Sequence, residues 1–403
     1  MLPKTWAKLK MHRYMVSKWL LAAVILTGVN GLCWASVAAV IAKPESSSDE
    51  GEKLYQQRCA ACHDGPVARA PHKIMFPMQG PEYILSALND GIMQAQASGL
   101  SEQQKIALAE HLGGRTLAVK DASNIFYCAE NKEREKHTDN PTGTIANWGM
   151  GLKNSRAISA ETANLTTADV SKLSLKWAFA YPGATRARSQ PIASRGDLFV
   201  GSQDGTIFAL DLASGCAHWT FKADTEVRHA LSLSKANSDH PERLFFGDFN
   251  GAVYAIDRAN GSLVWKTTVN DHPDTTITGS PKLHGDRLYV PLSSREWASA
   301  ANPAYACCTF RGGVIALNIV DGTRVWAAYS VKKPKPTGAK NTLGVELMAP
   351  SGAPVWNSPT IDVKRNRLYV GTGENYSSPA SKTSDAVLAI DLDDGQILWS
   401  YQA

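Results

Sequence analysis

Three residues near the start of the chain are spaced for covalent chemistry: Cys59, Cys62 and His63. In a Cys-x-x-Cys-His run, the two thiols can add to the vinyl groups of a haem while the neighbouring imidazole ligates the iron. A zinc half-site or a redox-active Cys-x-x-Cys pair is the alternative, but a zinc site needs two further ligands and no second Cys/His pair follows nearby. The sequence therefore predicts haem c on Cys59 and Cys62, with His63 as the first axial ligand.

A methionine is expected as the second axial ligand, because Met/His ligation raises the reduction potential of an electron-carrying haem. The candidates are Met75, Met78 and Met93. A helix is predicted over residues 100–112, with Ser101 as its N-cap. Met93 lies just before this helix, in a stretch that resembles the ligand loop of small class I cytochromes c. We therefore choose Met93 and keep Met78 as the reserve.

A second unusual pair of thiols is Cys307 with its neighbour Cys308. Adjacent Cα atoms stand about 3.8 Å apart across a trans peptide, which is below the usual disulfide range. A bond between the two sulfurs would close a small, rigid ring, and two reduced, buried thiols are the alternative. Disulfides persist outside the cytoplasm, so the compartment of the chain bears on this choice.

The N-terminal leader indicates that compartment. Residues 19–42 contain no charged side chain, and five basic residues precede them. This layout is typical of a secretory signal peptide, although the apolar stretch is also long enough to span a bilayer as a retained anchor. Either interpretation of residues 1–42 makes the rest of the chain periplasmic or secreted, and only the retained anchor would attach it to a membrane.

Composition excludes other classes of protein. Of the 403 residues, 44% are hydrophobic and 20% are charged, which is typical of a globular chain. The leader holds five of the 42 basic residues and none of the acidic ones, so the remainder has 42 − 5 = 37 basic residues against 37 acidic ones. A body without excess positive charge is a poor candidate for nucleic-acid binding, and we expect none.

Beyond Lys153 the sequence becomes periodic. The repeated unit is Ala-x-(Asp/Asn)-x-x-x-Gly-x-x-x-Trp, and it begins at Ala209, Ala255, Ala316 and Ala389. In the Asp-x-x-x-Gly turn the side chain can accept turn amides and the glycine can adopt a positive φ. The following strand carries a tryptophan that can be buried between adjacent sheets. Repeats of this size predict an all-β propeller, of which about four blades are present.

These signals divide the chain into segments. We expect a leader at residues 1–42, a linker at 43–50, an all-α class I cytochrome c domain at 51–114, a connector at 115–147 and a truncated propeller at 148–403. Of the remaining cysteines, Cys128 lies in the connector and Cys216 in the turn of the first repeat. A structural disulfide between them would tie the connector to the propeller.

The tryptophan repeats resemble those of pyrroloquinoline-quinone (PQQ) dehydrogenases, whose propellers have eight blades. The lead-in around Trp148 and Asn154, and the run from Leu173 to Phe179, also resemble that family. With a cytochrome at its N-terminal end, the chain looks most like the cytochrome-type polyvinyl-alcohol dehydrogenases. Outer-membrane assembly scaffolds use the same repeat, so the residues of the site decide between the two classes.

The resemblance implies a quinone site. In the family a tryptophan lies flat under the PQQ ring, and this position falls on Trp356. A ring formed by two adjacent cysteines faces it, which corresponds to Cys307 and Cys308. Arg228 resembles the arginine that contacts the quinone, and Thr278 lies in a matching segment that we also assign to PQQ.

The resemblance also implies a calcium site. Glu296 falls on the position of a calcium-binding glutamate, and the family has an asparagine ligand after a Gly-Thr-Gly turn. Here Glu374 intervenes before Asn375, so either residue could be the ligand, and we prefer Asn375. Hard oxygen ligands such as these suit Ca²⁺. In the methanol-dehydrogenase pattern the cysteine pair precedes the glutamate, whereas in this chain it follows Glu296.

The function that the resemblance implies is oxidation of a secondary alcohol, polyvinyl alcohol or a similar molecule, to a ketone. Electrons would pass through PQQ to the chain's own haem c and then to a soluble cytochrome c or another acceptor. The family's catalytic Asp is expected beyond Ala403, so we assign no catalytic residue and expect these 403 residues alone to be inactive. The alternatives are a non-catalytic propeller scaffold and an inactive truncated chain that only binds haem.

Overall fold

The computed structural model describes residues 47–403 except 66, 68, 69, 90, 118–124, 130–143, 183, 185 and 237–239. The predicted leader, the first part of the predicted linker and most of the predicted connector therefore lie outside the described residues. Among the helices that are described, none is both long and apolar enough to cross a membrane.

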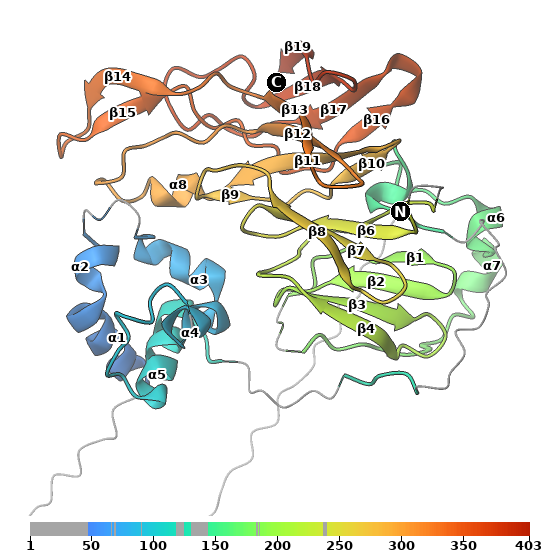
Figure 1. Ribbon diagram of the computed structural model, residues 1–403, viewed down its shortest axis with the longest axis horizontal. Helices are drawn as coiled ribbons and strands as arrows, with labels where there is room; N and C mark the ends of the chain where they lie inside the picture. The colour runs from blue at the N-terminus through green and yellow to red at the C-terminus, as the bar shows by residue number, and fades with distance from the viewer. Residues whose placement is uncertain are drawn as a thin grey trace, which may run out of the picture. The chain divides into compact units, whose positions relative to one another are not determined.

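The haem-motif region consists of short helices packed around a small core (Figure 1). Its elements are α1 (Ser47–Arg58), α2 (Ala60–His63), η1 (Lys73–Met75), α3 (Phe76–Gln79), α4 (Pro81–Asn89) and α5 (Glu102–Gly113). Helix α1 begins at Ser47, inside the segment that we expected to be linker. The predicted last helix is confirmed as α5: the Ser101 hydroxyl accepts from the Gln104 amide, and the Gln104 side chain accepts from the Ser101 amide in return.

Four antiparallel sheets follow, each a meander whose strands pair in sequence order (Figure 1). The first two are β1 (Ile192–Ser194), β2 (Asp197–Gly201), β3 (Thr206–Asp211) and β4 (Ala217–Lys222), then β5 (Ser232–Leu233), β6 (Arg243–Gly247), β7 (Ala252–Asp257) and β8 (Leu263–Thr268). The third is β10 (Lys282–His284), β11 (Arg287–Ser294), β12 (Gly313–Asn318) and β13 (Arg324–Tyr329), with β9 (Thr275–Thr276) beside β11. The fourth is β16 (Thr360–Asp362), β17 (Arg367–Gly371), β18 (Ala386–Asp391) and β19 (Ile397–Gln402).

The smaller elements complete the described part of the chain. They are η3 (Trp148–Met150), α6 (Ala160–Ala163), α7 (Thr167–Val170), α8 (Glu296–Ser299), η4 (Val363–Arg365) and a separate hairpin of β14 (Lys335–Lys340) with β15 (Glu346–Ala349).

The repeat tryptophans dock each sheet against the next, as the sequence predicted. Trp265, on β8, is 9% exposed, and its indole nitrogen donates to the carbonyl of Ile319 in the following sheet at 3.0 Å. A Cβ atom on Gly322 would lie 2.7 Å from this ring, so the turn glycine is required both for its φ of +74° and for space. Trp177, Trp219 and Trp326 lie against the turn glycines in the same way, whereas Trp399 is 42% exposed.

A lead-in segment, residues 145–154, crosses the first strand of every sheet. It hydrogen-bonds to one residue in each of these strands: Ala193 in β1, Leu233 in β5, Lys282 in β10 and Ile361 in β16. Lys282 is fully buried, and its ammonium donates to four oxygens of the segment at 2.6–3.2 Å. Burial lowers the pKa of Lys282 to about 8. This tie between all four sheets was not evident from the repeats.

The meander topology gives the sheets two different ends. Connections from the first to the second strand and from the third to the fourth leave at one end, which we call the turn face because it holds the Asp-x-x-x-Gly turns. Connections from the second to the third strand, and from one sheet to the next, leave at the other end, which we call the site face for the reasons given below.

Candidate functional site

All the residues predicted to bind PQQ or calcium lie in connections of the site face. Arg228 lies between β4 and β5, Thr278 between β9 and β10, Glu296, Cys307 and Cys308 between β11 and β12, Trp356 between β15 and β16, and Asn375 between β17 and β18. The topology therefore brings to one end of the sheets residues that are spread over about 150 positions of sequence.

The cysteine pair is disulfide-bonded, as predicted, and the peptide between Cys307 and Cys308 is cis. The ring is fastened to β15, because the Met348 amide donates to the Cys307 carbonyl at 3.0 Å. The predicted disulfide between Cys128 and Cys216 is also present, and it ties the connector to the first sheet.

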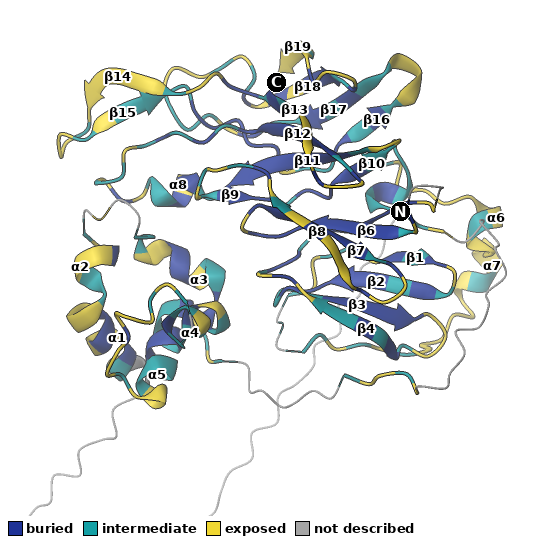
Figure 2. Cartoon of the chain, viewed as in Figure 1, coloured by how far each residue is buried: buried dark blue, intermediate teal, exposed yellow. Residues whose placement is uncertain are grey.

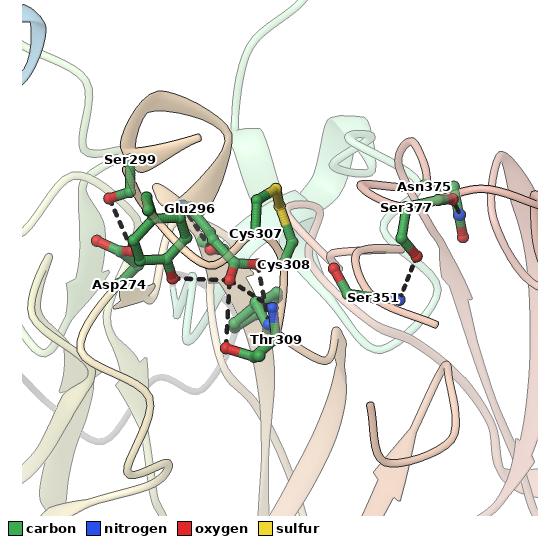
Figure 3. The surroundings of a disulfide bond; sticks show 12 residues. Asp274, Glu296, Ser299, Cys307, Cys308, Thr309, Ser351, Asn375 and Ser377 are labelled. Atoms are coloured by element: carbon green, nitrogen blue, oxygen red, sulfur yellow. Dashed lines mark hydrogen bonds between the residues drawn. A yellow bond between two sulfur atoms is a disulfide. The ribbon is translucent and has the colours of Figure 1, made fainter. Parts of the chain in front are cut away.

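Glu296 fixes the loop that carries this ring (Figure 3). Its side chain is fully buried, and it accepts hydrogen bonds from the Tyr305 hydroxyl at 2.8 Å and from the amides of Thr309 and Phe310 at 2.5 and 2.9 Å. The His272 ring lies 3.3 Å away. Burial raises the pKa of the Glu296 carboxyl, but the hydrogen bonds from His272 and the two amides outweigh it and hold the pKa below its usual value. Glu296 is therefore a buried anion that anchors the residues directly after the disulfide.

The expected calcium ligands do not converge in this structure. Figure 3 shows Glu296 and Asn375 on opposite sides of the Cys307–Cys308 ring. The Asn375 amide is occupied within its own loop: its oxygen accepts from the Ser381 hydroxyl at 2.8 Å and its nitrogen donates to the Ser377 carbonyl. Glu374, the other candidate, is exposed. The hydrogen-bond donors around Glu296 suit a residue that anchors the loop. Glu296 and Asn375 together do not form a cation-binding site in this structure. The calcium assignment stays a prediction.

Trp356 presents its indole to solvent on the site face, with 61% of its surface exposed. A Cβ atom on Gly373 would lie 2.9 Å from its indole nitrogen, so the Gly-Thr-Gly turn after β17 leaves room for the ring. Backbone hydrogen bonds join this part of the chain to the loop with the disulfide: the Gly352 amide donates to Phe310 and the Gly312 amide to Gly352, both at 2.9 Å. The disulfide and Trp356 therefore belong to one connected set of loops.

Arg228 stacks on Phe249, 3.9 Å from the ring centre, and is paired with Glu226. Arg295 lies over the same ring at 5.3 Å. Within the described residues, the buried Nε atoms of both arginines and the buried hydroxyl of Thr278 lack a hydrogen-bond partner. Burial lowers the pKa of both guanidinium groups, which nevertheless stay charged because their ordinary pKa is so high. The site face thus offers unpaired donors and positive charge to a carboxylated ligand, and this fits PQQ.

The haem motif has the geometry that iron ligation needs. Cys59 and Cys62 are free thiols, and His63 is buried. The Nδ1 atom of His63 contacts the Pro71 carbonyl oxygen at 2.7 Å, which orients the ring and leaves Nε2 for the metal. The residues present therefore fit a covalent haem.

The choice of the second axial ligand stays a prediction. Met93 packs against the same core cluster as Cys59, which is consistent with a position near the haem. Met75 is buried at 2% exposure and Met78 is half-buried.

Several contributors to the site were missed by sequence reasoning. Arg295 lies directly before Glu296, in the segment that resembles the family's calcium-binding one, but the sequence assigned it no role of its own. His272 and Tyr305 have no spacing signal either, because they meet Glu296 only through the folding of two long connections. The number of partners around a buried carboxylate could not be inferred from its position in a family segment.

The fold and the site define the class as a PQQ-type propeller joined to a small cytochrome domain. The family described as glucose/ethanol/alcohol dehydrogenase, beta-propeller domain, matches residues 150–403, and the cytochrome C oxidase, cbb3-type, subunit III family matches residues 46–112. The chain therefore belongs to the PQQ dehydrogenase propeller family.

Several individual proteins of known name are similar to this chain. The chain is 34% identical over 389 residues to a polyvinylalcohol dehydrogenase of Pseudomonas sp., covering 92% of this chain and 60% of that protein. It is 32% identical over 366 residues to a polyvinylalcohol dehydrogenase of Sphingopyxis sp. (strain 113P3), covering 88% and 56%. The chain thus spans 56–60% of the length of these relatives. Among solved structures, the quinohemoprotein alcohol dehydrogenase from Comamonas testosteroni is similar over 64% of this chain and 41% of that protein, with 20% identity and a TM-score of 0.52. This similarity supports the fold alone.

Proposed function

We propose that this chain is part of an exported quinohaemoprotein that oxidises a secondary alcohol, polyvinyl alcohol or a similar molecule, to a ketone. The electrons pass by way of PQQ to the chain's own haem c, and from there to a cytochrome-type acceptor in the periplasm or outside the cell. The four sheets form an arc of a propeller of the eight-bladed type. The names of the two polyvinylalcohol dehydrogenases support the substrate class.

The observation that carries the proposal is the set of groups on the site face. Trp356 and the Cys307–Cys308 ring supply two firm surfaces for a planar ring, and Arg228 and Arg295 supply unpaired donors for carboxylates. PQQ, when bound, accepts the electron pair that leaves the alcohol. A propeller that only binds proteins does not require the disulfide ring.

In this proposal the residues of this chain hold and orient the bound groups. Glu296 keeps the disulfide loop in place through its bonds to the Thr309 and Phe310 amides, and Arg228 neutralises negative charge that develops on a bound ligand. His63, oriented by the Pro71 carbonyl, would offer its free nitrogen to a haem iron. No step is assigned to calcium, because Glu296 and Asn375 do not form a cradle for it.

Turnover of the full-length protein, loaded with PQQ and supplied with an artificial electron acceptor, tests the function. We expect oxidation of polyvinyl alcohol and of small secondary alcohols, and a pyridine haemochrome spectrum typical of covalent haem. Cys59→Ser should weaken or abolish the covalent linkage, because it removes one of the two thioether bonds. Failure to oxidise either alcohol class while haem is covalently attached would favour the inactive-chain alternative, and absence of PQQ binding would favour a scaffold.

A further inference from the structure

The β14–β15 hairpin stands apart from the four sheets. Its two strands pair only with each other, and all six residues of β14 are exposed (Figure 2). An isolated two-stranded hairpin is only marginally stable in water. It lies within a connection of 30 residues, from 330 to 359, and connections of that length in compact domains usually carry a function.

The hairpin is strongly basic although the body of the chain is balanced in charge. Residues 332–349 contain four lysines, at positions 332, 333, 335 and 340, and a single acidic residue, Glu346. All four lysines are exposed, and none of them forms an ion pair within the described residues. Their charge is therefore available to a partner.

A cavity that runs from the base of the hairpin along β13 extends this charge. Its volume is about 720 Å³, and its lining includes Arg311, Arg324 and Lys333 but only one carboxylate, that of Asp271. Arg311 is held in place, because it stacks 3.7 Å from the centre of the Tyr329 ring and donates to the Val331 carbonyl at 3.0 Å. We call the four lysines, Arg311 and Arg324 together the basic surface.

The hairpin end of the basic surface borders the loop that carries the disulfide. Met348 of β15 lines the cavity, and its amide donates to the Cys307 carbonyl. The Asn341 side chain, in the turn of the hairpin, donates to the Pro303 carbonyl at 2.6 Å, in the loop that leads to the disulfide. A molecule bound to the basic surface would therefore lie beside the disulfide ring.

We propose that the basic surface docks an acidic electron-carrying protein. Carboxylates on such a partner would pair with the lysines, and a protruding acidic segment would enter the cavity beside Arg311 and Arg324. Complementary charge of this kind accelerates encounter and fixes orientation. The concave shape favours a protein over a membrane, because lipid headgroups form a surface that cannot follow a cavity. The redox role of the partner rests on the proposed function, whereas the docking itself does not.

Binding is tested without turnover, by surface plasmon resonance on the purified full-length protein. The probe is cytochrome c whose lysines have been succinylated, which makes it acidic, and unmodified basic cytochrome c is the charge control. The test variant replaces Lys332, Lys333, Lys335 and Lys340 by Glu. The matched control makes the same change in net charge elsewhere, at the exposed residues Lys153, Lys172, Lys176 and Lys364. Circular dichroism confirms that both variants fold.

We expect the unaltered protein to bind the succinylated probe at low salt and at least tenfold more weakly at high salt, since exposed charges are screened. The hairpin variant should lose at least tenfold in affinity and the matched control less than about threefold. Equal losses in both variants, or no binding at low salt, would overturn the proposal.

Lysines on an exposed strand also deter edge-to-edge aggregation, and that role alone predicts self-association of the hairpin variant without any loss of probe binding. Tighter binding to phosphatidylglycerol vesicles than to the probe would mean that the surface serves a membrane. Loss of alcohol oxidation with docking intact would refute the proposed function alone.

Discussion

Two sets of connections, one on each face of the sheets, differ in how closely their lengths agree from one repeat to the next. On the turn face, every connection from the third to the fourth strand has five residues: 212–216, 258–262, 319–323 and 392–396. On the site face, the connections from the second to the third strand have four residues in the first two sheets, 18 in the third and 14 in the fourth: 202–205, 248–251, 295–312 and 372–385.

This difference separates the residues that build the fold from those that bind ligands. In the four Asp-x-x-x-Gly turns of the turn face the glycine has a φ between +73° and +77°, and a tryptophan from earlier in the chain, Trp177 or the repeat tryptophan of the preceding sheet, packs against it. On the site face the added residues carry the disulfide, the buried Glu296 and the basic hairpin. The regular face can change little without loss of the interface between sheets, whereas the other face can gain loops at small cost in stability.

The largest effect is expected from comparing two tryptophans. Trp265→Ala should lower the free energy of unfolding by about 3–5 kcal/mol, because it empties a buried site between sheets and removes the bond to Ile319. Trp356→Ala, on the site face, should lower it by less than about 0.5 kcal/mol, because that ring is largely exposed. Chemical denaturation of both variants measures the difference. Similar losses of stability in the two variants would contradict the view that the turn face builds the fold and the site face binds ligands.

The next effect concerns pH. The folded protein releases the Lys282 proton near pH 8, whereas the unfolded chain keeps it to about pH 10.5. Between these values the unfolded state binds more protons, so the free energy of unfolding should rise with pH, by at most about 3 kcal/mol. Lys282→Met should flatten this rise, and Lys364→Met, at an exposed position, should preserve it. An unchanged slope in the Lys282 variant would show that its ammonium is not desolvated.

A smaller effect is expected at the anchor of the disulfide loop. Glu296→Gln places an amide nitrogen where the carboxylate accepts from backbone amides, so the variant should lose about 1–3 kcal/mol of stability. Glu374→Gln, an exposed neighbour on the same face, should change it by less than about 0.5 kcal/mol. Thermal or chemical denaturation above pH 6 gives both values. The contribution of Glu296 should fade as the pH falls through its lowered pKa, since protonation removes the anion.

The smallest difference is expected between two glycines with similar backbones. Gly344→Ala, with a φ of +80° and open space around it, should cost about 1 kcal/mol from backbone strain alone. Gly322→Ala has a similar φ but also meets the Trp265 ring at 2.7 Å, so it should cost about 1 kcal/mol more. Equal costs would mean that the tryptophan does not depend on the glycine for space.

The turn face could be predicted from sequence because its physics is local. An Asp or Asn and a glycine four positions later specify the turn, and Ser101 specifies the start of α5 in the same local way. The tryptophan eight positions after the Asp packs against the turn glycine of the next sheet, and the repetition of the unit along the chain predicts that contact. The site face could be predicted only as a set of residues. The partners of Glu296, the orphaned Nε atom of Arg295 and the β14–β15 hairpin depend on which long connections meet in space. Spacing along the chain does not encode those meetings.

The most direct test of the account is a titration of the full-length apoprotein with PQQ, followed by quenching of tryptophan fluorescence. We expect PQQ to bind on the site face, between Trp356 and the Cys307–Cys308 ring. Binding should be saturable, at least tenfold weaker in Trp356→Ala, and changed less than about twofold in Trp297→Ala, which alters another exposed indole. Equal affinity of the Trp356 variant and the unaltered protein would contradict the account.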